Sequence, residues 1–330
     1  MLIEEVSVSI IIDEIKKYKT TSYYFLDKLF VEYLLKYNST SIFEDKSFII
    51  RNNENVLYCP VTIEKKNGSK YLNFFGNPFF CIYLKDDINF FISFKKKIKE
   101  IFKKENIVDI NFVIEKNFPN ILNQNNLILN KNPFNKILNV KYIDLSLSDE
   151  NIKKGFKKGL KYLLNKDYSK LSYLIIDSTN YNKEVSEMRN MHQEISKKIT
   201  RTKDTWLINE KMILANKGFL VQVSDENRVI SYSLFFNNGQ ESCYFSSCTY
   251  RDLYRVYENI THKSIFEAIK YLKNKKCKKL TLGETKIIYS DKIISDKEKN
   301  ICMFKSSFGG ELVNHYHVNI NNFDSIDLYL

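Results

Sequence analysis

The stretch GFLVQVSDENRVISYSLFFNNGQESCYFSSCTY, residues 218–250, reads as three short strands joined by two turns. The apolar, β-branched and aromatic segments predict strands at residues 219–223, 229–236 and 242–248. The two intervening turns carry the Asp, Asn and Gly residues that tolerate the tight backbone of hairpin loops. We therefore expect an antiparallel meander here.

The hydrophobic period then changes from that of a strand to that of a helix. Residues 258–274 are predicted to form a helix with one apolar face, because apolar residues recur at helical spacing: Ile265, Ala268, Ile269 and Leu272. Residues 280–282 follow as a buried strand that ends in Gly283 and Glu284. This order of strand, strand, strand, helix and strand is where we expect the active site.

The same order of elements occurs earlier in the chain. Three strands, a helix and a fourth strand are predicted at residues 48–50, 56–63, 71–75, 88–102 and 108–114. The two halves share element order but not residue identity, which indicates an internal duplication. A chain of 330 residues has room for about two domains of roughly 150 residues. We therefore predict an N-terminal module over residues 1–145 and a C-terminal module over residues 146–330.

The flanking segments follow the same two periods. Residues up to about Tyr37 carry apolar stripes at helical spacing, with Thr21 and Ser22 as a cap for the second stripe. Residues 117–136 are rich in Asn and contain two prolines, which indicates an irregular connection. The remaining predicted elements are a strand at 142–145, a basic helix at 148–164, a strand at 171–177, a helix at 185–199 and a strand at 312–320.

Composition and charge exclude several classes of protein. No apolar run approaches the roughly 20 residues that span a bilayer, and the acidic start, MLIEE, is unlike a signal peptide, so we expect a cytoplasmic protein. Six scattered cysteines without C-x-x-C spacing indicate reduced thiols and no metal site. The net charge of +12 suits an anionic partner, but lysines spread over helix surfaces are more typical of an ordinary solvated surface.

Several segments of the second half resemble a known family. The resemblance rests on residues 191–194, 200–202, 205–206, 212–213 and 218–221, together with Leu282-Gly283-Glu284. It rests most on Phe304-Lys305-Ser306-Ser307-Phe308-Gly309-Gly310-Glu311, which looks like a Phe-Lys-x-x-Phe-Gly signature. Their order and spacing resemble the FemAB-like branch of the GNAT acyltransferase superfamily.

The resemblance implies an α+β fold of two tandem GNAT-like modules with mixed, mostly antiparallel sheets, and transfer of an acyl group to an amine. Most relatives use acyl-coenzyme A as the donor, whereas the peptidoglycan-bridge enzymes use aminoacyl-tRNA. The acceptor would be an amino sugar or a cell-surface glycan precursor. The strands at 242–248 and 280–282 should splay, so that a pantetheine arm could pair with an exposed strand edge.

One segment departs from the pattern of ordinary GNAT enzymes. Where they carry a glycine-rich turn for the coenzyme A pyrophosphate, this chain has residues 250–257 without a glycine. Backbone amides at the helix start could still bind phosphate, with help from Arg251 and Arg255. Tyr250 joins this candidate cofactor-binding set. Cys248 joins it by position, although without a paired His or Asp we interpret it as a buried thiol rather than a nucleophile.

Three residues are candidates for catalysis. Glu284, just past a predicted central strand, could act as a base or hold the acceptor amine; the alternative is a carboxylate that caps the next loop. Lys305 could neutralise a phosphate or the developing oxyanion, or could be an exposed lysine between two buried phenylalanines. His192 lies near the apolar stripe of its helix, so it is either a base or a packed core histidine.

Three further residues are candidates for binding the acceptor. Arg201 could clamp a carboxylate or phosphate through two hydrogen bonds, or could be a cation at a helix C-terminus. Trp206 could line a pocket, although core packing is its more common role. Tyr244 could protonate a leaving thiolate. His315 and His317 alternate on the last predicted strand, where two histidines without a carboxylate are typical of ordinary sheet residues.

Three functions remain open from the sequence. The first is an N-acyltransferase that uses acyl-coenzyme A. The second is an aminoacyltransferase that uses aminoacyl-tRNA, which the missing glycine turn and the basic helix at 148–164 favour. The third is a non-enzymatic nucleic-acid-binding protein on the same fold, which only the net charge favours.

Overall fold

The quoted stretch forms an antiparallel meander of β11 (Gly218–Asp225), β12 (Arg228–Asn237) and β13 (Glu241–Thr249) in the computed structural model. The structure describes residues 1–17, 25–52, 55–83, 88–115, 134–166, 168–226, 228–285, 295–323 and 326. These residues belong to two compact units. Unit 1 is Met1–Thr21, Asn38–Leu138 and Asn314–Leu330, and unit 2 is Ser22–Tyr37 and Asn139–Val313.

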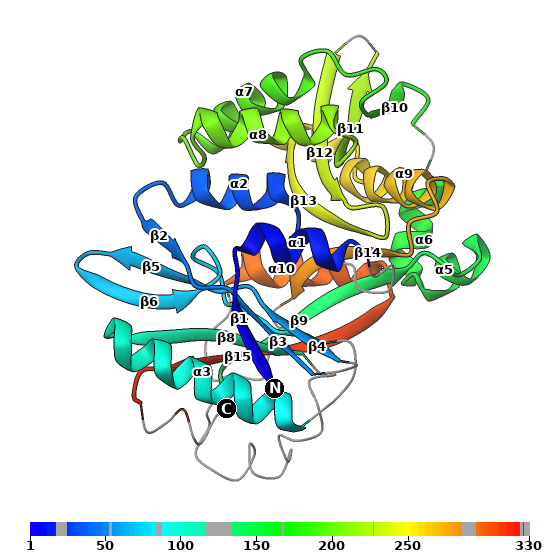
Figure 1. The fold of residues 1–330 in the computed structure, drawn as a ribbon. Coiled ribbons are helices and arrows are strands. Elements are labelled where there is room, and N and C mark those ends of the chain that lie inside the picture. Colours follow the sequence, from blue (N-terminus) through cyan, green and yellow to red (C-terminus); the bar gives the residue numbers. More distant parts are fainter. Residues whose placement is uncertain are drawn as a thin grey trace. The chain divides into compact units, whose positions relative to one another are not determined.

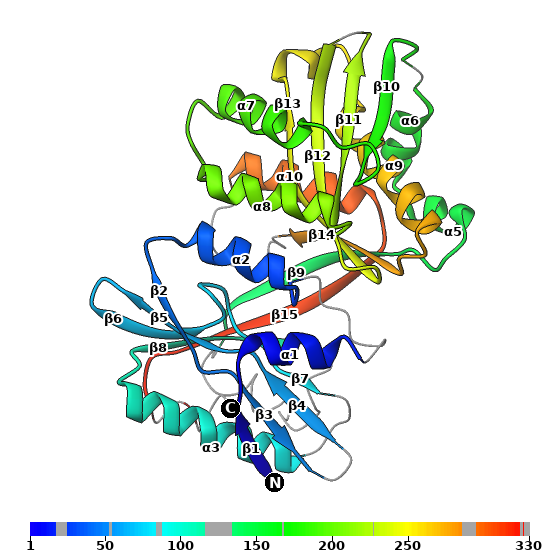
Figure 2. The same ribbon diagram turned by 45° about the horizontal axis from the view of Figure 1, so that its top comes forward.

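Unit 2 extends the meander on both sides. Strand β10 (Leu171–Ile176) pairs antiparallel with β11, β14 (Lys279–Thr285) pairs parallel with β13, and β9 (Phe134–Asp144) pairs antiparallel with β14. The strand order is therefore β10-β11-β12-β13-β14-β9. In Figure 2, β10 to β13 stand side by side. The mixed, mostly antiparallel sheet expected from the sequence is confirmed.

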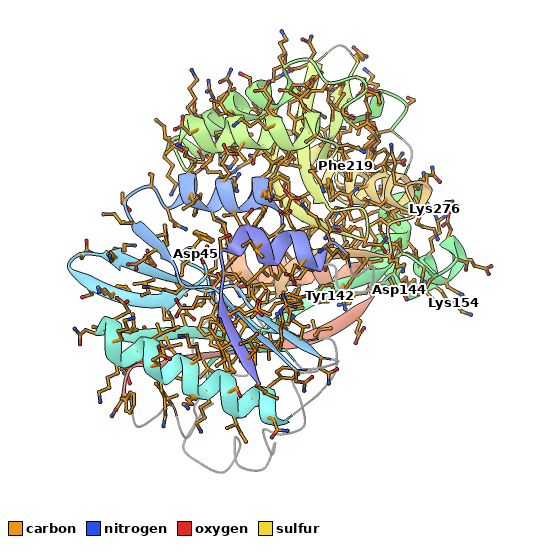
Figure 3. All side chains as sticks on the ribbon, in the orientation of Figure 1. Asp45, Tyr142, Asp144, Lys154, Phe219 and Lys276 are labelled. Carbon is orange, nitrogen blue, oxygen red and sulfur yellow. The ribbon has the colours of Figure 1, made fainter. Side chains whose placement is uncertain are left out.

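Helices cover both faces of this sheet. Helix α9 (Ile260–Asn274) packs on one face, where its apolar stripe meets Phe219 and Val221 of β11 in a buried core. Helices α7 (Glu184–Ser196) and α8 (Lys203–Leu214) lie on the other face (Figure 1). Figure 3 labels Phe219, whose ring lies 4.6 Å from that of Tyr271 on α9. The alternation of side chains along each strand thus supplies two apolar faces.

Three further helices complete unit 2. Helix α2 (Lys28–Tyr37) comes from the N-terminal part of the chain and packs on α8. Helices α5 (Asp149–Gly155) and α6 (Lys158–Asn165) pack beside α9 through Ile152, Phe156 and Leu160. Helix α10 (Asp296–Ser307) lies against β14 and starts with a capping box formed by Ser295 and Glu298. A short 3-10 helix, Arg251–Arg255, joins β13 to α9.

Unit 1 contains two strand groups, ordered β1-β3-β4-β7 and β15-β8-β6-β5-β2. Its elements are β1 (Leu2–Glu5), α1 (Val8–Ile15), β2 (Ile42–Asp45), β3 (Phe48–Arg51), β4 (Val56–Cys59), β5 (Thr62–Lys66), β6 (Ser69–Asn73), β7 (Ile82–Tyr83), α3 (Ile88–Glu105), β8 (Asp109–Glu115) and β15 (Glu311–Ile320). Asp45, labelled in Figure 3, accepts a hydrogen bond from the first amide of α1, Val8 N, at 2.7 Å.

The two units share one supersecondary device. In unit 1, β6 and β8 are parallel neighbours connected through α3, and in unit 2, β13 and β14 are parallel neighbours connected through α9. This agrees with the duplication expected from element order. The compact units interleave in sequence, because β15 pairs with β8 of unit 1 although it follows β14 in the chain. The module boundary between residues 145 and 146 stays a prediction, because compact units defined by contacts do not show where a duplicated segment begins or ends.

The strand predicted at residues 56–63 is in fact two strands. Strand β4 ends at Cys59 and pairs with β3 and β7, whereas β5 begins at Thr62 and pairs with β2 and β6. Pro60 separates them. Proline has no N–H and a fixed φ, so it interrupts a strand ladder and lets the chain change sheets.

The predicted helix at 148–164 is likewise broken into α5 and α6. Phe156 and Lys157 are extended, with ψ of 140° and 151°, and Lys157 N donates to the Ser307 carbonyl at 2.8 Å. Gly155 disfavours helix at this point, because glycine costs about 1 kcal/mol relative to alanine in a helix.

Other differences lie near the chain start and in connections. Residues 2–5, expected to be helical, form β1 and pair with β3, and the helix begins only after Ser7, whose side chain caps it. Helix α7 ends at Ser196, because Lys197 adopts a left-handed φ of 56°. The predicted cap Thr21-Ser22 and residues 117–133 of the predicted connection lie outside the described residues. Among the described helices, none combines the length and apolarity needed to cross a membrane.

Candidate active site

Strands β13 and β14 form a fork in unit 2. Their parallel ladder covers only Glu241–Cys243 and Lys279–Thr281. Strand β13 then continues to Thr249, while β14 continues to Thr285 along its other neighbour, β9. The splay expected between these two strands is therefore present, and it starts after Cys243.

A β-bulge bends β13 at the base of the fork. Ser246 lies opposite Leu234 and Tyr244 opposite Phe235, so Phe245 is the extra residue. Bulges increase the local twist and re-aim side chains. Tyr244 and Ser247 are hydrogen-bonded to each other through their hydroxyls at 2.5 Å. Phe245 and Ser246 instead contact residues from α2 and the α7–α8 connection, described below.

Lys305, in the last turn of α10, lies at the end of β14. Its Nζ donates to the Glu284 carbonyl at 2.7 Å. A Cβ at Gly283, which has a φ of +79°, would lie 3.3 Å from the same Nζ. Burial lowers the pKa of Lys305, while Cys243, Glu284 and Cys302 oppose that shift. The structure thus brings Lys305 and Glu284 together, and Glu284 lies within the strand, exposed, rather than after it.

The two signature phenylalanines that flank Lys305 in the sequence each pack against other rings. Phe304 lies 6.5 Å from Tyr244 and 5.6 Å from Phe308, and Phe308 lies 5.8 Å from Phe156, all as ring-centroid distances. Tyr244 is therefore on the Lys305 side of the fork.

The glycines of the signature allow close backbone packing. Gly309 and Gly310 have φ of +63° and +72°. A Cβ at Gly309 would lie 2.1 Å from the Gly155 carbonyl, and a Cβ at Gly310 would lie 2.1 Å from the carbonyl of Tyr142 on β9, which Figure 3 labels. Only glycine fits these positions.

The sequence interpretation missed His262, which lies in the first turns of α9. Its ring centroid is 4.7 Å from Phe304 and 5.9 Å from Phe308. Burial lowers the pKa of His262 to about 4. The available signal was its position three residues before Ile265, which puts a polar side chain on the apolar stripe of the helix.

A second cluster lies on the α7–α8 face of β13. The Arg201 guanidinium donates to Ser246 Oγ at 3.0 Å and lies 5.5 Å from the Trp206 ring and 5.1 Å from the Phe245 ring. The His192 ring lies 5.9 Å from Trp206. Three predicted residues, His192, Arg201 and Trp206, are thus neighbours.

Charge and burial in this second cluster favour a neutral histidine. His192 is half-buried, and its Nδ1 lies 3.3 Å from the Thr200 hydroxyl. Burial and the Arg201 guanidinium lower the pKa of His192. Trp206 is 3% exposed, so its indole packs in the core and only supports Arg201.

Tyr33 of α2 also belongs to the second cluster and was missed by the sequence. Its ring lies 5.2 Å from Phe245. Burial raises the pKa of Tyr33 to about 12, and Arg201 opposes the shift. No local pattern marks Tyr33, because it lies on an ordinary apolar stripe more than 160 residues before Arg201.

Two of the four candidate cofactor residues, Cys248 and Tyr250, contact α7. Cys248 is buried against α7, where its Sγ lies 3.8 Å from the Met188 carbonyl, and burial raises its pKa to about 12. Tyr250 donates to Glu194 on α7 at 2.9 Å. Arg251 is exposed, and the side chain of Arg255 lies outside the described part of the structure.

The start of α9 is covered rather than open. Asn259 is fully buried, and its amide donates to the carbonyls of Leu163 and Lys166 at 2.9 and 3.2 Å. Glu258 forms an ion pair with Lys166 at 2.7 Å. The end of α6 and a carboxylate therefore occupy the region of the helix N-terminus, where an anion would otherwise bind.

The equivalent fork in unit 1 is filled by its own chain. The parallel ladder of β6 and β8 covers two residues of each strand, after which the chain turns at Phe74–Asn77. Phe79 then bonds to β8: its N–H donates to the Asn111 carbonyl at 2.9 Å, and its carbonyl accepts from Val113 N at 2.8 Å. Unit 1 therefore has no open fork in its described residues.

No group of three or more His, Cys, Asp or Glu side chains in the described ranges is arranged to hold a metal ion. His315 and His317 lie on β15, opposite Glu115 and Val113 of β8.

Several solved structures share this architecture. The crystal structure of FemX matches with a TM-score of 0.64 at 10% identity, over 97% of this chain and 98% of that chain. L-PGS from Bacillus licheniformis gives a TM-score of 0.52 at 10% identity over 92% and 96% of the two chains. A tandem GNAT protein from the clavulanic acid biosynthesis pathway, without AcCoA, gives 0.51 at 8% identity over 96% and 98%.

No protein-family model and no curated protein matches the sequence. The likeness to solved structures shows the fold: the chain has the α+β, tandem GNAT-like fold of FemX, as its Phe304–Glu311 signature implied. At 8–10% identity, the similarity shows a shared fold but does not show shared substrates.

Proposed function

We propose that unit 2 transfers an acyl or aminoacyl group from an activated thioester or ester to an amine. The observation that carries this proposal is the Lys305 ammonium, held on the Glu284 carbonyl beside the fork between β13 and β14. A fork gives an extended donor a strand edge to lie along. A fixed cation at its end supplies the charge that acyl transfer needs in the transition state.

In the proposed reaction, the acceptor amine attacks the donor carbonyl. A C–N bond forms, and the carbonyl oxygen gains negative charge, which Lys305 stabilises. The C–S or C–O bond of the donor then breaks, and the proton lost by the amine ends on the leaving group. The exposed Glu284 carboxylate holds the amine or accepts its proton, as expected from the sequence.

The second cluster is the proposed acceptor side. Arg201 carries a planar cation between two aromatic rings, with one hydrogen bond to Ser246. This arrangement suits a carboxylate or phosphate of the acceptor. An amino sugar or glycan precursor that carries such a group fits the proposal, and His192, kept neutral, is the alternative base on this side.

Two observations favour aminoacyl-tRNA as the donor. The covered start of α9 offers no open helix end for a pyrophosphate among the described residues. The lysines of α5, of α6 and of the residues between them are exposed. This segment lies beside the Phe304–Glu311 signature, because Lys157 N donates a hydrogen bond to the Ser307 carbonyl. A basic surface beside the site suits a polyanionic donor. The exposed lysines are Lys153, Lys154, Lys157, Lys158 and Lys161.

Acyl-coenzyme A remains the second candidate donor, and the fork itself favours it. A pantetheine arm is extended and carries amides that can pair with the edge of β13. The tandem GNAT protein with the same architecture is named as a structure without AcCoA, so AcCoA is a ligand considered for that protein.

The test compares donor discharge in the presence of amine acceptors. The purified protein is mixed with amino sugars and anionic aminoacyl peptides, and with either acetyl-coenzyme A or a bulk pool of aminoacyl-tRNA. We expect salt-sensitive, acceptor-dependent discharge of aminoacyl-tRNA, and loss of it in Glu284→Gln without unfolding. Release of free coenzyme A instead would identify the second donor. Tight RNA binding with no discharge of either donor would favour the non-enzymatic alternative.

A further inference from the structure

The ring of His262, on α9, contacts both phenylalanines of the signature. Its ring meets Phe304 at 62° with centroids 4.7 Å apart, and it stacks on Phe308 at 23° with centroids 5.9 Å apart. Phe304 and Phe308 in turn meet edge to face at 5.6 Å. The three rings therefore contact one another as a triangle at the end of α10, and Lys305 lies between the two phenylalanines in the sequence.

This triangle packs at the turn of α10 from which Lys305 reaches the Glu284 carbonyl. A lysine side chain has four rotatable methylene bonds, so its charge is placed only if its backbone and stem are fixed. The Phe308 ring is held by the core, because it is 1% exposed and packs on Phe156. The Phe304 ring is only half-buried, and the ring nearest to it is that of His262. Loss of the imidazole would therefore free the turn on the side that faces Tyr244.

We propose that His262 is a positioning residue for the transfer reaction: its ring, packed between Phe304 and Phe308, holds the last turn of α10 so that Lys305 stays on the Glu284 carbonyl. The inference rests on the proposed function of the fork. His262 acts through its neighbours, and the reacting groups remain Lys305 and Glu284.

The charges around the triangle agree with this role. The groups that face Lys305 are Cys243 from β13, Glu284 from β14 and Cys302 from α10, and His262 faces the same turn from α9. Burial keeps the pKa of His262 well below neutrality, so a second positive charge is absent beside Lys305 under physiological conditions. A neutral ring can pack against phenylalanine without desolvating a charge.

The experiment compares His262→Ala with His262→Phe, which replaces the ring without its nitrogens. Phe266→Ala is the matched control, because Phe266 lies one turn later on α9 and its ring packs on Phe156, with centroids 6.1 Å apart. Two readouts are taken. One is kcat, KM and the basic limb of the pH profile. The other is the pKa of Lys305 measured by NMR after reductive ¹³C-methylation, with Lys305→Arg assigning the signal.

We expect His262→Ala to lower kcat about tenfold with little change in KM, and to raise the pKa of Lys305 as the amine becomes more solvated. His262→Phe should restore most of kcat and return the lysine pKa toward that of the unmodified chain. Phe266→Ala should lower the free energy of unfolding and leave both kcat and the Lys305 pKa unchanged. The NMR readout needs no substrate, so it tests the positioning role even if the chain transfers no acyl group.

Two results would overturn the proposal. An unchanged Lys305 pKa in His262→Ala would show that the ring does not hold the lysine. Equal losses in His262→Phe and His262→Ala would assign the effect to the ring nitrogens, which contradicts positioning through packing.

Discussion

Gly283 allows a direct test of how closely Lys305 must be placed. Gly283 and Gly68 both have a φ of +79°. A Cβ at Gly283 would lie 3.3 Å from Lys305 Nζ, whereas a Cβ at Gly68, in the turn between β5 and β6, would have no atom within 4 Å. Gly283→Ala and Gly68→Ala therefore impose the same backbone strain, and only the first crowds the lysine.

The expected energies follow from these contacts. Alanine in a left-handed conformation costs about 1–2 kcal/mol, so both variants should lose a similar amount of stability. The added methyl group at Gly283 must push Nζ by a few tenths of an ångström from its 2.7 Å bond to the Glu284 carbonyl. A hydrogen bond from a charged donor contributes about 1.5–3 kcal/mol, and loss of half of it corresponds to a roughly three- to tenfold lower rate.

The assay pairs urea unfolding with steady-state kinetics on the donor that the discharge experiment identifies. We expect equal shifts in unfolding midpoint for the two variants, and a roughly three- to tenfold lower kcat in Gly283→Ala alone. The reasoning is refuted if Gly283→Ala keeps the kcat of the unmodified chain, because Lys305 would then tolerate displacement. It is also refuted if Gly68→Ala loses as much activity, because strain alone would explain both.

Three other predictions concern single side chains. Lys305→Ala should lower kcat about 100-fold or more, while Lys299→Ala, an exposed lysine on the same helix, should leave kcat unchanged; equal effects would remove Lys305 from the chemistry. Arg201→Lys keeps the charge but loses the planar group between two rings, so the acceptor KM should rise about tenfold in kinetic titrations with kcat little changed, and a fall in kcat alone would contradict a binding role. His262 has a folded pKa of about 4, below its ordinary value of 6.5, so the unfolded chain takes the proton first, and stability present above pH 6.5 is lost as the pH falls toward 4, by up to about 3 kcal/mol. Urea unfolding across that range should show this loss, and His262→Phe should flatten it; an equal slope in both chains would mean that the imidazole is not held neutral.

The sequence predicted those parts of the fold that local patterns encode. The meander, the α9 stripe and the strand that ends at Glu284 all appear within a few residues of their expected bounds. The two aromatic residues and two glycines that surround Lys305 in the sequence can also be read directly from Phe304–Glu311. Even the division of the 56–63 strand had a local signal, Pro60, whose missing N–H ends a ladder.

Other parts of the site depend on contacts between distant segments. Tyr33 reaches the Arg201 cluster because α2 packs on α8 of unit 2, and nothing in residues 28–37 states which unit that helix joins. The covered start of α9 depends on Asn259 bonding to the end of α6, more than 90 residues earlier. The side chains of Cys248 and Tyr250 contact α7 because strand register decides which face of the sheet a side chain joins. That register cannot be read from composition.

The two forks show how one supersecondary device can lead to two different outcomes. In unit 1, a turn at Phe74–Asn77 that contains Gly76 follows β6, so the chain leaves the strand and returns through Phe79 to pair beside β8. In unit 2, no glycine occurs between Gly239 and Gly283, so β13 runs on past its bulge to Thr249. The same absence removes the glycine turn that ordinary GNAT enzymes place at the helix start. An unbroken β13 is thus found together with the splay from β14, and the bonds of Asn259 to the end of α6 cover the start of α9. This is the combination expected if the proposed donor is held mainly at its acyl end and by a basic surface.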